Sequence, residues 1–200
     1  MHMKSLKDLV DVRAGHPFRG SVLACEAGPT RVIQLRDVSA DGRVAWASLV
    51  RTELLAHKPP DWLHDGELLF AGRGGRAYAL CLHRVPEHTV CAQYFFVLRC
   101  RPTAGLLPEY LAWYINRAPS QRYLMSNAEG STQLSIRRAV LEDLPVPLPD
   151  LARQRVLVKL ARAAANERQR LDSLIRNREQ QMDVLAQHLL TPPQRPHAAP

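Results

Sequence analysis

Residues 151 to 190 contain neither proline nor glycine, and this run limits the possible fold more than any other feature. It predicts one uninterrupted α-helix, because proline and glycine are the residues that most disfavour a helix interior. At about 1.5 Å per residue, such a helix is roughly 60 Å long. Asp150 is a suitable N-cap, and Pro149 keeps the preceding backbone extended. We therefore expect a rod much longer than a typical helix of three or four turns.

Apolar residues recur along this segment at the spacing of one helix face, which indicates a surface that packs against a second helix. Glu167 and Arg178 interrupt the stripe. The positions expected to contact the second helix are Leu157, Leu160, Ala164, Glu167, Leu171, Leu174, Ile175, Arg178, Met182, Leu185 and Leu189.

The two charged interruptions favour one particular pairing. If two copies pair antiparallel about an axis near Asp172 and Ser173, Glu167 of one copy faces Arg178 of the other, and apolar positions face one another. A parallel, in-register dimer would instead place like charges together. Two alternatives stay open: both side chains reach solvent from the edge of the stripe, or the second helix belongs to a different protein.

Residues 1–150 differ in composition from the helical run, since they hold all ten glycines and all three tryptophans. Strands are predicted at 30–39, at 89–100 and, as a pair joined by a glycine-rich turn, within 66–85; a short helix or turn is predicted at 5–15 and two helices at 106–130. We expect a mixed α/β domain with a curved sheet. Residues 191–200 are too polar and proline-rich to order themselves and should form a disordered tail.

The chain is basic, with a net charge of +8 and a pI near 9.8, and 23 of its 27 basic residues are arginine. Arginine suits phosphates and guanine edges, although a GC-rich genome also enriches it. Residues 1–150 hold 18 basic and 15 acidic side chains, so this part is not a general polycation. Binding to an anionic partner should therefore depend on local patches.

Cysteine spacing and hydropathy exclude several protein classes. The four cysteines are too far apart for a zinc knuckle, and Cys25, Cys81 and Cys100 lie in apolar runs typical of buried free thiols. The amino terminus has no secretory apolar core, and no 18-residue apolar run exists. We expect a cytoplasmic protein with no membrane span, no metal and no cofactor.

Two apparent catalytic motifs are weak. Residues 72–77, GRGGRA, match a dinucleotide-binding turn, but a strand-like segment follows where that fold needs a helix. A plain glycine hairpin and an arginine-bearing DNA-contacting loop are the two remaining interpretations. Asp61 and Glu67 resemble a nuclease pair without the lysine that should follow, and a metal site with His57, His64 and Asp65 is less favoured than a solvated loop. Methyltransferase, P-loop and nucleophile-elbow motifs are absent, so we expect no catalysis by this chain.

Small polar residues, glutamine and arginine in loops can read base edges or bind phosphates. On this basis the candidate DNA-binding residues are Arg73, Arg76, Ser131, Thr132, Gln133, Arg137 and Arg138. The alternative for each is an ordinary surface role.

Residues 130–154, GSTQLSIRRAVLEDLPVPLPDLARQ, resemble the end of a target recognition domain in the specificity (S) subunits of type I restriction-modification systems. There a glycine-containing loop precedes an isoleucine, a leucine–proline strand and a helix with an early glutamine. The matching positions are Gly130, Gln133, Ile136, Leu144, Pro145, Pro147, Pro149, Leu151 and Gln154. Segments 6–20, 65–80 and 109–130 resemble the family's opening, hairpin and helix pair, so the likeness spans nearly the whole chain.

The family usually has two recognition domains and two long helices in one chain, whereas this sequence has one of each. It therefore looks like a half-subunit, either natural or a fragment of a longer chain, and such a half would restore the arrangement as a twofold homodimer. The alternating prolines would form a rigid connection that fixes the orientation of each domain relative to its long helix. The resemblance implies binding to a bipartite double-stranded DNA target and recruitment of a DNA adenine methyltransferase subunit that holds S-adenosylmethionine, with a restriction/translocase subunit as a further partner. The alternatives are a free-standing DNA-binding regulator and a coiled-coil adaptor that binds protein.

Overall fold

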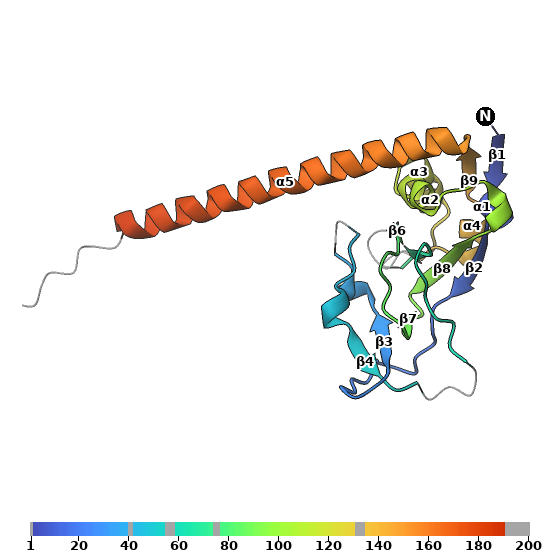
Figure 1. The fold of residues 1–200 in the computed structure, drawn as a ribbon, viewed down its shortest axis with the longest axis horizontal. Helices are drawn as coiled ribbons and strands as arrows, with labels where there is room; N and C mark the ends of the chain where they lie inside the picture. The colour runs from blue at the N-terminus through green and yellow to red at the C-terminus, as the bar shows by residue number, and fades with distance from the viewer. Residues whose placement is uncertain (1, 40–41, 55–58, 74–76, 131–134, 191–200) are drawn as a thin grey trace, which may run out of the picture. The chain divides into compact units, whose positions relative to one another are not determined.

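A computed structural model describes residues 2–39, 42–54, 59–73, 77–130 and 135–190 (Figure 1). Contacts divide the chain into two units, Met1–Val158 and Lys159–Pro200. The first unit includes the first turns of the long helix, and the domain boundary expected at residue 150 stays a prediction. The mixed α/β class predicted from the sequence is confirmed.

The central sheet has four antiparallel strands in the order β2-β8-β5-β6. Its strands are β2 (Val10–Ala14), β8 (Phe95–Cys100), β5 (Leu68–Ala71) and β6 (Tyr78–Cys81). Side chains of β5 alternate between two cores: Leu68 and Phe70 pack with the helices, whereas Leu69 and Ala71 pack on the opposite face. Both faces are covered, which explains why β5 is apolar at every position. The predicted hairpin within 66–85 is confirmed as β5–β6.

A second sheet has three strands, β4 (Val50–Thr52), β3 (Thr30–Ile33) and β7 (Thr89–Cys91), with β3 antiparallel to β4 and parallel to β7. Two strand predictions need correction. The strand expected at 30–39 ends at Ile33, because Gln34 and Asp37 form a capping box that begins the 3₁₀ helix η1 (Leu35–Asp37). The strand expected at 89–100 is split between the two sheets, since the chain turns where Phe95 N–H donates to Ala92 O.

Short helices complete the first unit: α1 (Leu6–Leu9), α2 (Pro108–Ile115), α3 (Ala118–Ser126) and α4 (Arg138–Glu142), with 3₁₀ turns η2 (Trp46–Ser48) and η3 (Pro102–Ala104). The predicted helix pair is confirmed as α2 and α3. Asn116, directly after α2, binds the edge strand β6: its amide accepts from Ala79 N–H at 3.0 Å and donates to Ala79 O at 2.7 Å. This side chain takes the place of a further strand and closes the sheet edge.

The proline-rich segment forms strand β9 (Pro145–Leu148), which pairs antiparallel with β1 (His2–Ser5). Proline has no N–H, so the hydrogen-bonded pairs of this ladder are those of Val146 and Leu148. The carbonyls of Pro145 and Pro147 face away from β1 and accept hydrogen bonds from Tyr114 Oη at 3.1 Å and Tyr110 Oη at 2.8 Å. Alternating prolines therefore leave no unpaired N–H on the side that faces α2.

Helix α5 (Leu151–Leu190) begins at the expected N-cap, since Asp150 Oδ1 accepts from Arg153 N–H at 2.9 Å. Gln154, one turn later, is fully buried. Its amide donates to Gly105 O and Pro149 O and accepts from Leu107 N–H, each at 2.8 Å. Leu157 and Val158 then pack against the larger core. The first two turns of α5 are thus part of the first unit.

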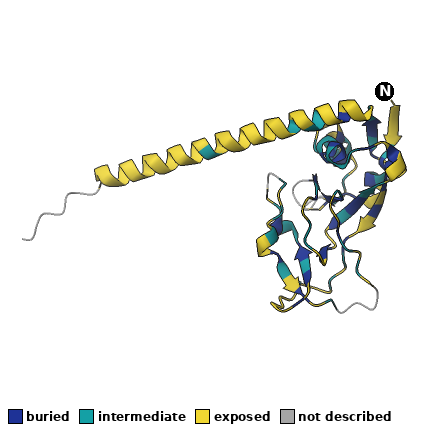
Figure 2. Cartoon of the chain, in the orientation of Figure 1, coloured by how far each residue is buried: buried dark blue, intermediate teal, exposed yellow. Residues whose placement is uncertain are grey.

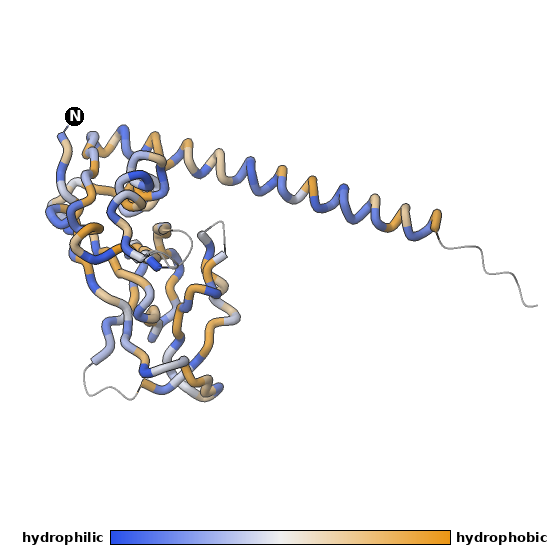
Figure 3. The backbone as a smooth tube through the Cα atoms, turned by 180° about the vertical axis from the view of Figure 1, so that it is seen from behind, coloured by the Kyte–Doolittle hydropathy of each residue, from blue (hydrophilic) through white to orange (hydrophobic). Residues whose placement is uncertain are grey.

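Beyond Val158 the helix is almost entirely exposed (Figure 2), and apolar residues recur among polar ones along it (Figure 3). Among the described residues, no helix is long and apolar enough to cross a membrane. The expected tail, 191–200, lies outside the described residues.

Replacing Gln154 with alanine should destabilise the first unit. The substitution removes the hydrogen-bond partner of Leu107 N–H and of two backbone carbonyls, all in part-buried hydrogen bonds, so the free energy of unfolding should fall by roughly 2–4 kcal/mol. Chemical denaturation at one fixed protein concentration measures this. Gln180→Ala, at an exposed position of the same helix, is the matched control and should change stability by less than about 0.5 kcal/mol. Equal stability of the two variants would contradict the anchoring role.

Candidate nucleic-acid interface

Two loops far apart in the sequence are joined beside the central sheet. Ser135 pairs antiparallel with Arg73 on one side and with Glu129 on the other. Glu129 N–H donates to Ser135 O at 3.0 Å, Ser135 N–H donates to Glu129 O at 2.8 Å, and Ile136 N–H donates to Gly72 O at 2.7 Å. The glycine-rich turn after β5 and the loop before α4 therefore share one small backbone ladder.

Gly72 makes this close approach possible. A Cβ at this position would lie 2.9 Å from the Phe70 ring and 3.2 Å from Ile136 Cβ. Ile136 is buried in the larger core beside Phe70. The absence of a side chain at Gly72 thus lets Ile136 anchor the second loop against the sheet.

The ladder determines which side chains share a face. Residues directly opposite in antiparallel pairs project to the same side, so Arg73, Ser135 and Glu129 do so. Ile136 points into the core, and Arg137 returns to the exposed face two residues after Ser135. We call Arg73, Glu129, Ser135 and Arg137 the loop-base surface.

Charge on the loop-base surface is partly paired. Arg137 Nη2 lies 2.8 Å from Glu129 Oε1, and the two side chains are 66% and 54% exposed. Arg73 is also exposed, and no acidic side chain among the described residues pairs with it. Both guanidinium groups are permanently cationic, so this surface can bind anionic or acceptor-rich groups.

The remaining candidates are placed differently. Arg138 begins α4, where its Nε lies 2.8 Å from Glu142 Oε1 one turn later. Arg76, Ser131, Thr132 and Gln133 lie outside the described residues. Glu129 and Ser135 were not identified from the sequence. Their positions on either side of the candidate loop were the available signal.

The nuclease-like pair has a structural role. Asp61 Oδ1 lies 2.7 Å from Arg99 Nη1, Glu67 binds Arg99 Nε, and Arg99 Nη2 donates to Trp62 O at 3.0 Å. Burial alone would lower the pKa of Arg99, but the hydrogen bonds and charges of Glu67 and Asp61 raise it. The pair thus holds β8 against the chain segment that precedes β5.

Other proposed chemistry also finds an ordinary explanation. Strand β6, not a helix, follows the glycine-rich turn, so the dinucleotide-binding interpretation fails. No group of three or more His, Cys, Asp or Glu within the described parts of the chain could hold a metal ion. His57 lies outside those parts.

The cysteines are free thiols in different environments. Burial raises the pKa of Cys91 to about 12, and burial together with the charge of Glu109 raises the pKa of Cys100 to about 12. Both thiols therefore stay protonated at neutral pH. The prediction that Cys25 is buried is wrong: its apolar run forms no strand, and the side chain is exposed.

No protein-family model and no curated protein sequence matches this chain. Similar folds occur among solved structures. The S subunit of a type I restriction-modification system from M. genitalium is 15% identical, with a TM-score of 0.59 over 94% of this chain and 45% of that one. The HsdS subunit from Thermoanaerobacter tengcongensis is 19% identical, with a TM-score of 0.57 over 88% of this chain and 39% of that one.

A third structure, described as showing complex assembly and conformational transition of the type I R-M system, contains a chain that is 17% identical. Its TM-score is 0.58 over 94% of this chain and 43% of that one. This protein thus spans less than half the length of the chains it matches. It shares the fold of type I S subunits, which confirms at the level of fold the resemblance seen in the sequence.

Proposed function

We propose that this protein is a DNA sequence-specificity component that binds a bipartite target as an antiparallel homodimer and brings a separate DNA methyltransferase to it. The observation that supports this most is the match to one half of an S subunit, with one recognition-type unit and one long helix. A second copy supplies the missing half. The loop-base surface, with its two arginines, is the proposed DNA-contacting part of each copy.

The second unit supports the homodimer because its apolar side chains have no partner within the described chain. Leu160, Leu171, Leu174, Ile175 and Leu185 are each between 53% and 63% exposed. Fully burying one such side chain contributes about 1.5–3 kcal/mol. Covering this stripe with a second helix therefore gives a strong driving force for association.

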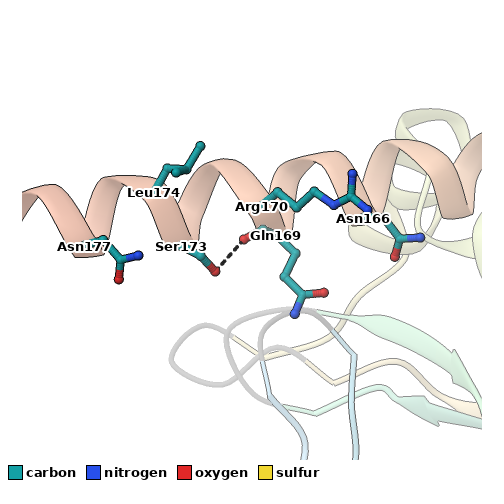
Figure 4. Close-up of a pocket in the computed structure, with 6 residues that line it drawn as sticks. All are labelled: Asn166, Gln169, Arg170, Ser173, Leu174 and Asn177. Atoms are coloured by element: carbon teal, nitrogen blue, oxygen red, sulfur yellow. Dashed lines mark hydrogen bonds between the residues drawn. The ribbon is translucent and has the colours of Figure 1, made fainter.

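In the middle of the helix, the side opposite the stripe is polar. Figure 4 shows Leu174 on one side, with Ser173, Gln169 and Asn166 on the other. Ser173 Oγ donates to Gln169 O within the helix at 2.9 Å. The two faces favour association through the leucine side, with the polar side left in water.

Charge selects the antiparallel register. Glu167 and Arg178 are exposed and interrupt the stripe at equal distances from the point between Asp172 and Ser173. An antiparallel twofold dimer about that point pairs each Glu167 with the other copy's Arg178, twice per dimer. A twofold arrangement of the recognition units in turn predicts an inverted-repeat DNA target.

Chemistry in this proposal belongs to companion subunits. A methyltransferase subunit that binds S-adenosylmethionine would dock on the dimer and modify adenine, and a restriction/translocase subunit would join the same assembly. Recovery of a DNA-binding dimer that recruits no methyltransferase would instead identify a free-standing regulator.

Reversing the charge of Glu167 should weaken the dimer. Glu167→Arg places four arginines at the two contacts, so the dimer dissociation constant should rise roughly tenfold, and Glu167→Arg with Arg178→Glu should restore it. Light scattering over a concentration series measures this. Glu179→Arg makes the same charge change away from the stripe and should have little effect. A wild-type chain that stays monomeric, or an unaffected Glu167→Arg dimer, contradicts this arrangement.

Removing either arginine of the loop-base surface should weaken DNA binding. The target is first selected from a random duplex library with the wild-type protein. Arg73→Ala and Arg137→Ala should then raise the dissociation constant for it roughly 5- to 100-fold. The control is Arg101→Ala, because Arg101 is bound to Asp11 outside the loop-base surface. An equal loss in all three variants would indicate a general charge effect and not a site.

A further inference from the structure

The loop-base surface contains one carboxylate, Glu129, beside a group proposed to contact DNA. An acidic side chain repels the phosphate backbone, so its presence there needs a reason. Its ion pair with Arg137 is exposed on both sides, and such pairs contribute only about 0–1 kcal/mol to stability. Stability of the fold is therefore a weak explanation for Glu129.

We propose that Glu129 is a positioning residue for specificity: it holds the Arg137 guanidinium so that Arg137 binds a guanine edge in preference to a phosphate. This rests on the proposed function and assigns a role within the same surface. Glu129 reads no base itself and acts through Arg137.

Backbone hydrogen bonds fix the position of the Glu129 main chain. Two hydrogen bonds tie it to Ser135, and Ser135 is in turn paired with Arg73. Ile136, next to Ser135, is anchored in the core. The side chains of Glu129 and Arg137 thus project from neighbouring positions of one small ladder. The ladder is held by backbone hydrogen bonds, so a change in either side chain need not disturb the fold.

The ion pair leaves Arg137 able to read guanine. A guanidinium has five N–H donors, and the Glu129 carboxylate lies beside Nη2, with Oε1 2.8 Å away. Nη2 carries two hydrogens, and only one of them can point at Glu129. The other forms a pair of parallel donors, either with Nη1–H or with Nε–H, and this pair stays free. Guanine O6 and N7 need one such pair.

The carboxylate also discriminates between the two possible acceptors. A guanine edge is neutral and can bind Arg137 while the pair with Glu129 persists. A phosphate brings a second negative charge next to Glu129 and competes with it for the same guanidinium. Glu129 thus weakens non-specific contact more than specific contact, whereas Arg73, which has no described acidic partner, is suited to a phosphate.

The adjacent arginine provides a matched comparison. Arg138 is bound to Glu142 at 2.8 Å, the same distance as in the Arg137 pair, but on helix α4 and outside the ladder. Glu129→Gln and Glu142→Gln therefore remove the same charge from ion pairs of equal length at neighbouring arginines. Only the first should affect discrimination.

The experiment measures dissociation constants for the selected target duplex and for an unrelated duplex of equal length, at several salt concentrations. Glu129→Gln should tighten binding to the unrelated duplex roughly threefold to tenfold, because Arg137 is released to contact phosphate. The plot of log binding constant against log salt concentration should become steeper by about one released counterion. Binding to the target should not tighten, so the specificity ratio falls. Glu142→Gln should leave the ratio unchanged.

The Arg137→Gln background separates positioning from a general charge effect. There Glu129→Gln should no longer change the ratio, since the residue it positions is absent. An unchanged ratio in Glu129→Gln, an equal change in Glu142→Gln, or a persistent effect without Arg137 each overturns the inference while the proposed function stands. A wild-type protein that does not distinguish the two duplexes overturns both.

Discussion

One buried side-chain amide joins the start of the long helix to the segments of the first unit that lie next to it. Gln154 satisfies Leu107 N–H, Gly105 O and Pro149 O, which belong to the approach to α2 and to the end of the proline strand. None of these backbone groups has a regular secondary-structure partner at that point. A single amide, with donors and an acceptor in one plane, replaces the missing ladder. The start of α5 is consequently built into the core and is not a flexible linker.

In the proline strand β9, too, the arrangement is determined by the need of backbone N–H and C=O groups for hydrogen-bond partners. The backbone groups of a buried strand need partners on both edges, and among the described residues β9 pairs with a strand on one edge only. Placing proline at alternate positions removes the N–H groups from its other edge, and two tyrosine hydroxyls satisfy the carbonyls that remain. The pattern is stiff, as the sequence suggests, but its principal effect is to let a strand lie against a helix without unpaired donors.

Local patterns allowed much of this fold to be predicted. Helix α5, its Asp150 N-cap and the β5–β6 hairpin each depend on residues close in the sequence. The ladder of Arg73, Ser135 and Glu129 joins segments some sixty residues apart, and no local preference encodes it. The split of residues 89–100 between two sheets is non-local in the same way, because β7 pairs with β3, which lies far earlier in the chain.

The ladder also changes how the arginine content should be understood. Composition suggested that arginine serves an anionic partner, yet many arginines of the first unit are bound to its own carboxylates. The pairs include Arg13–Asp61, Arg99–Glu67, Arg101–Asp11, Arg137–Glu129 and Arg138–Glu142. These pairs, and the near balance of 18 basic and 15 acidic side chains in residues 1–150, argue against a uniformly cationic surface. In the proposed DNA-binding role, recognition would then depend on the few guanidinium groups that the backbone places together, and on the carboxylate that would select what one of them binds.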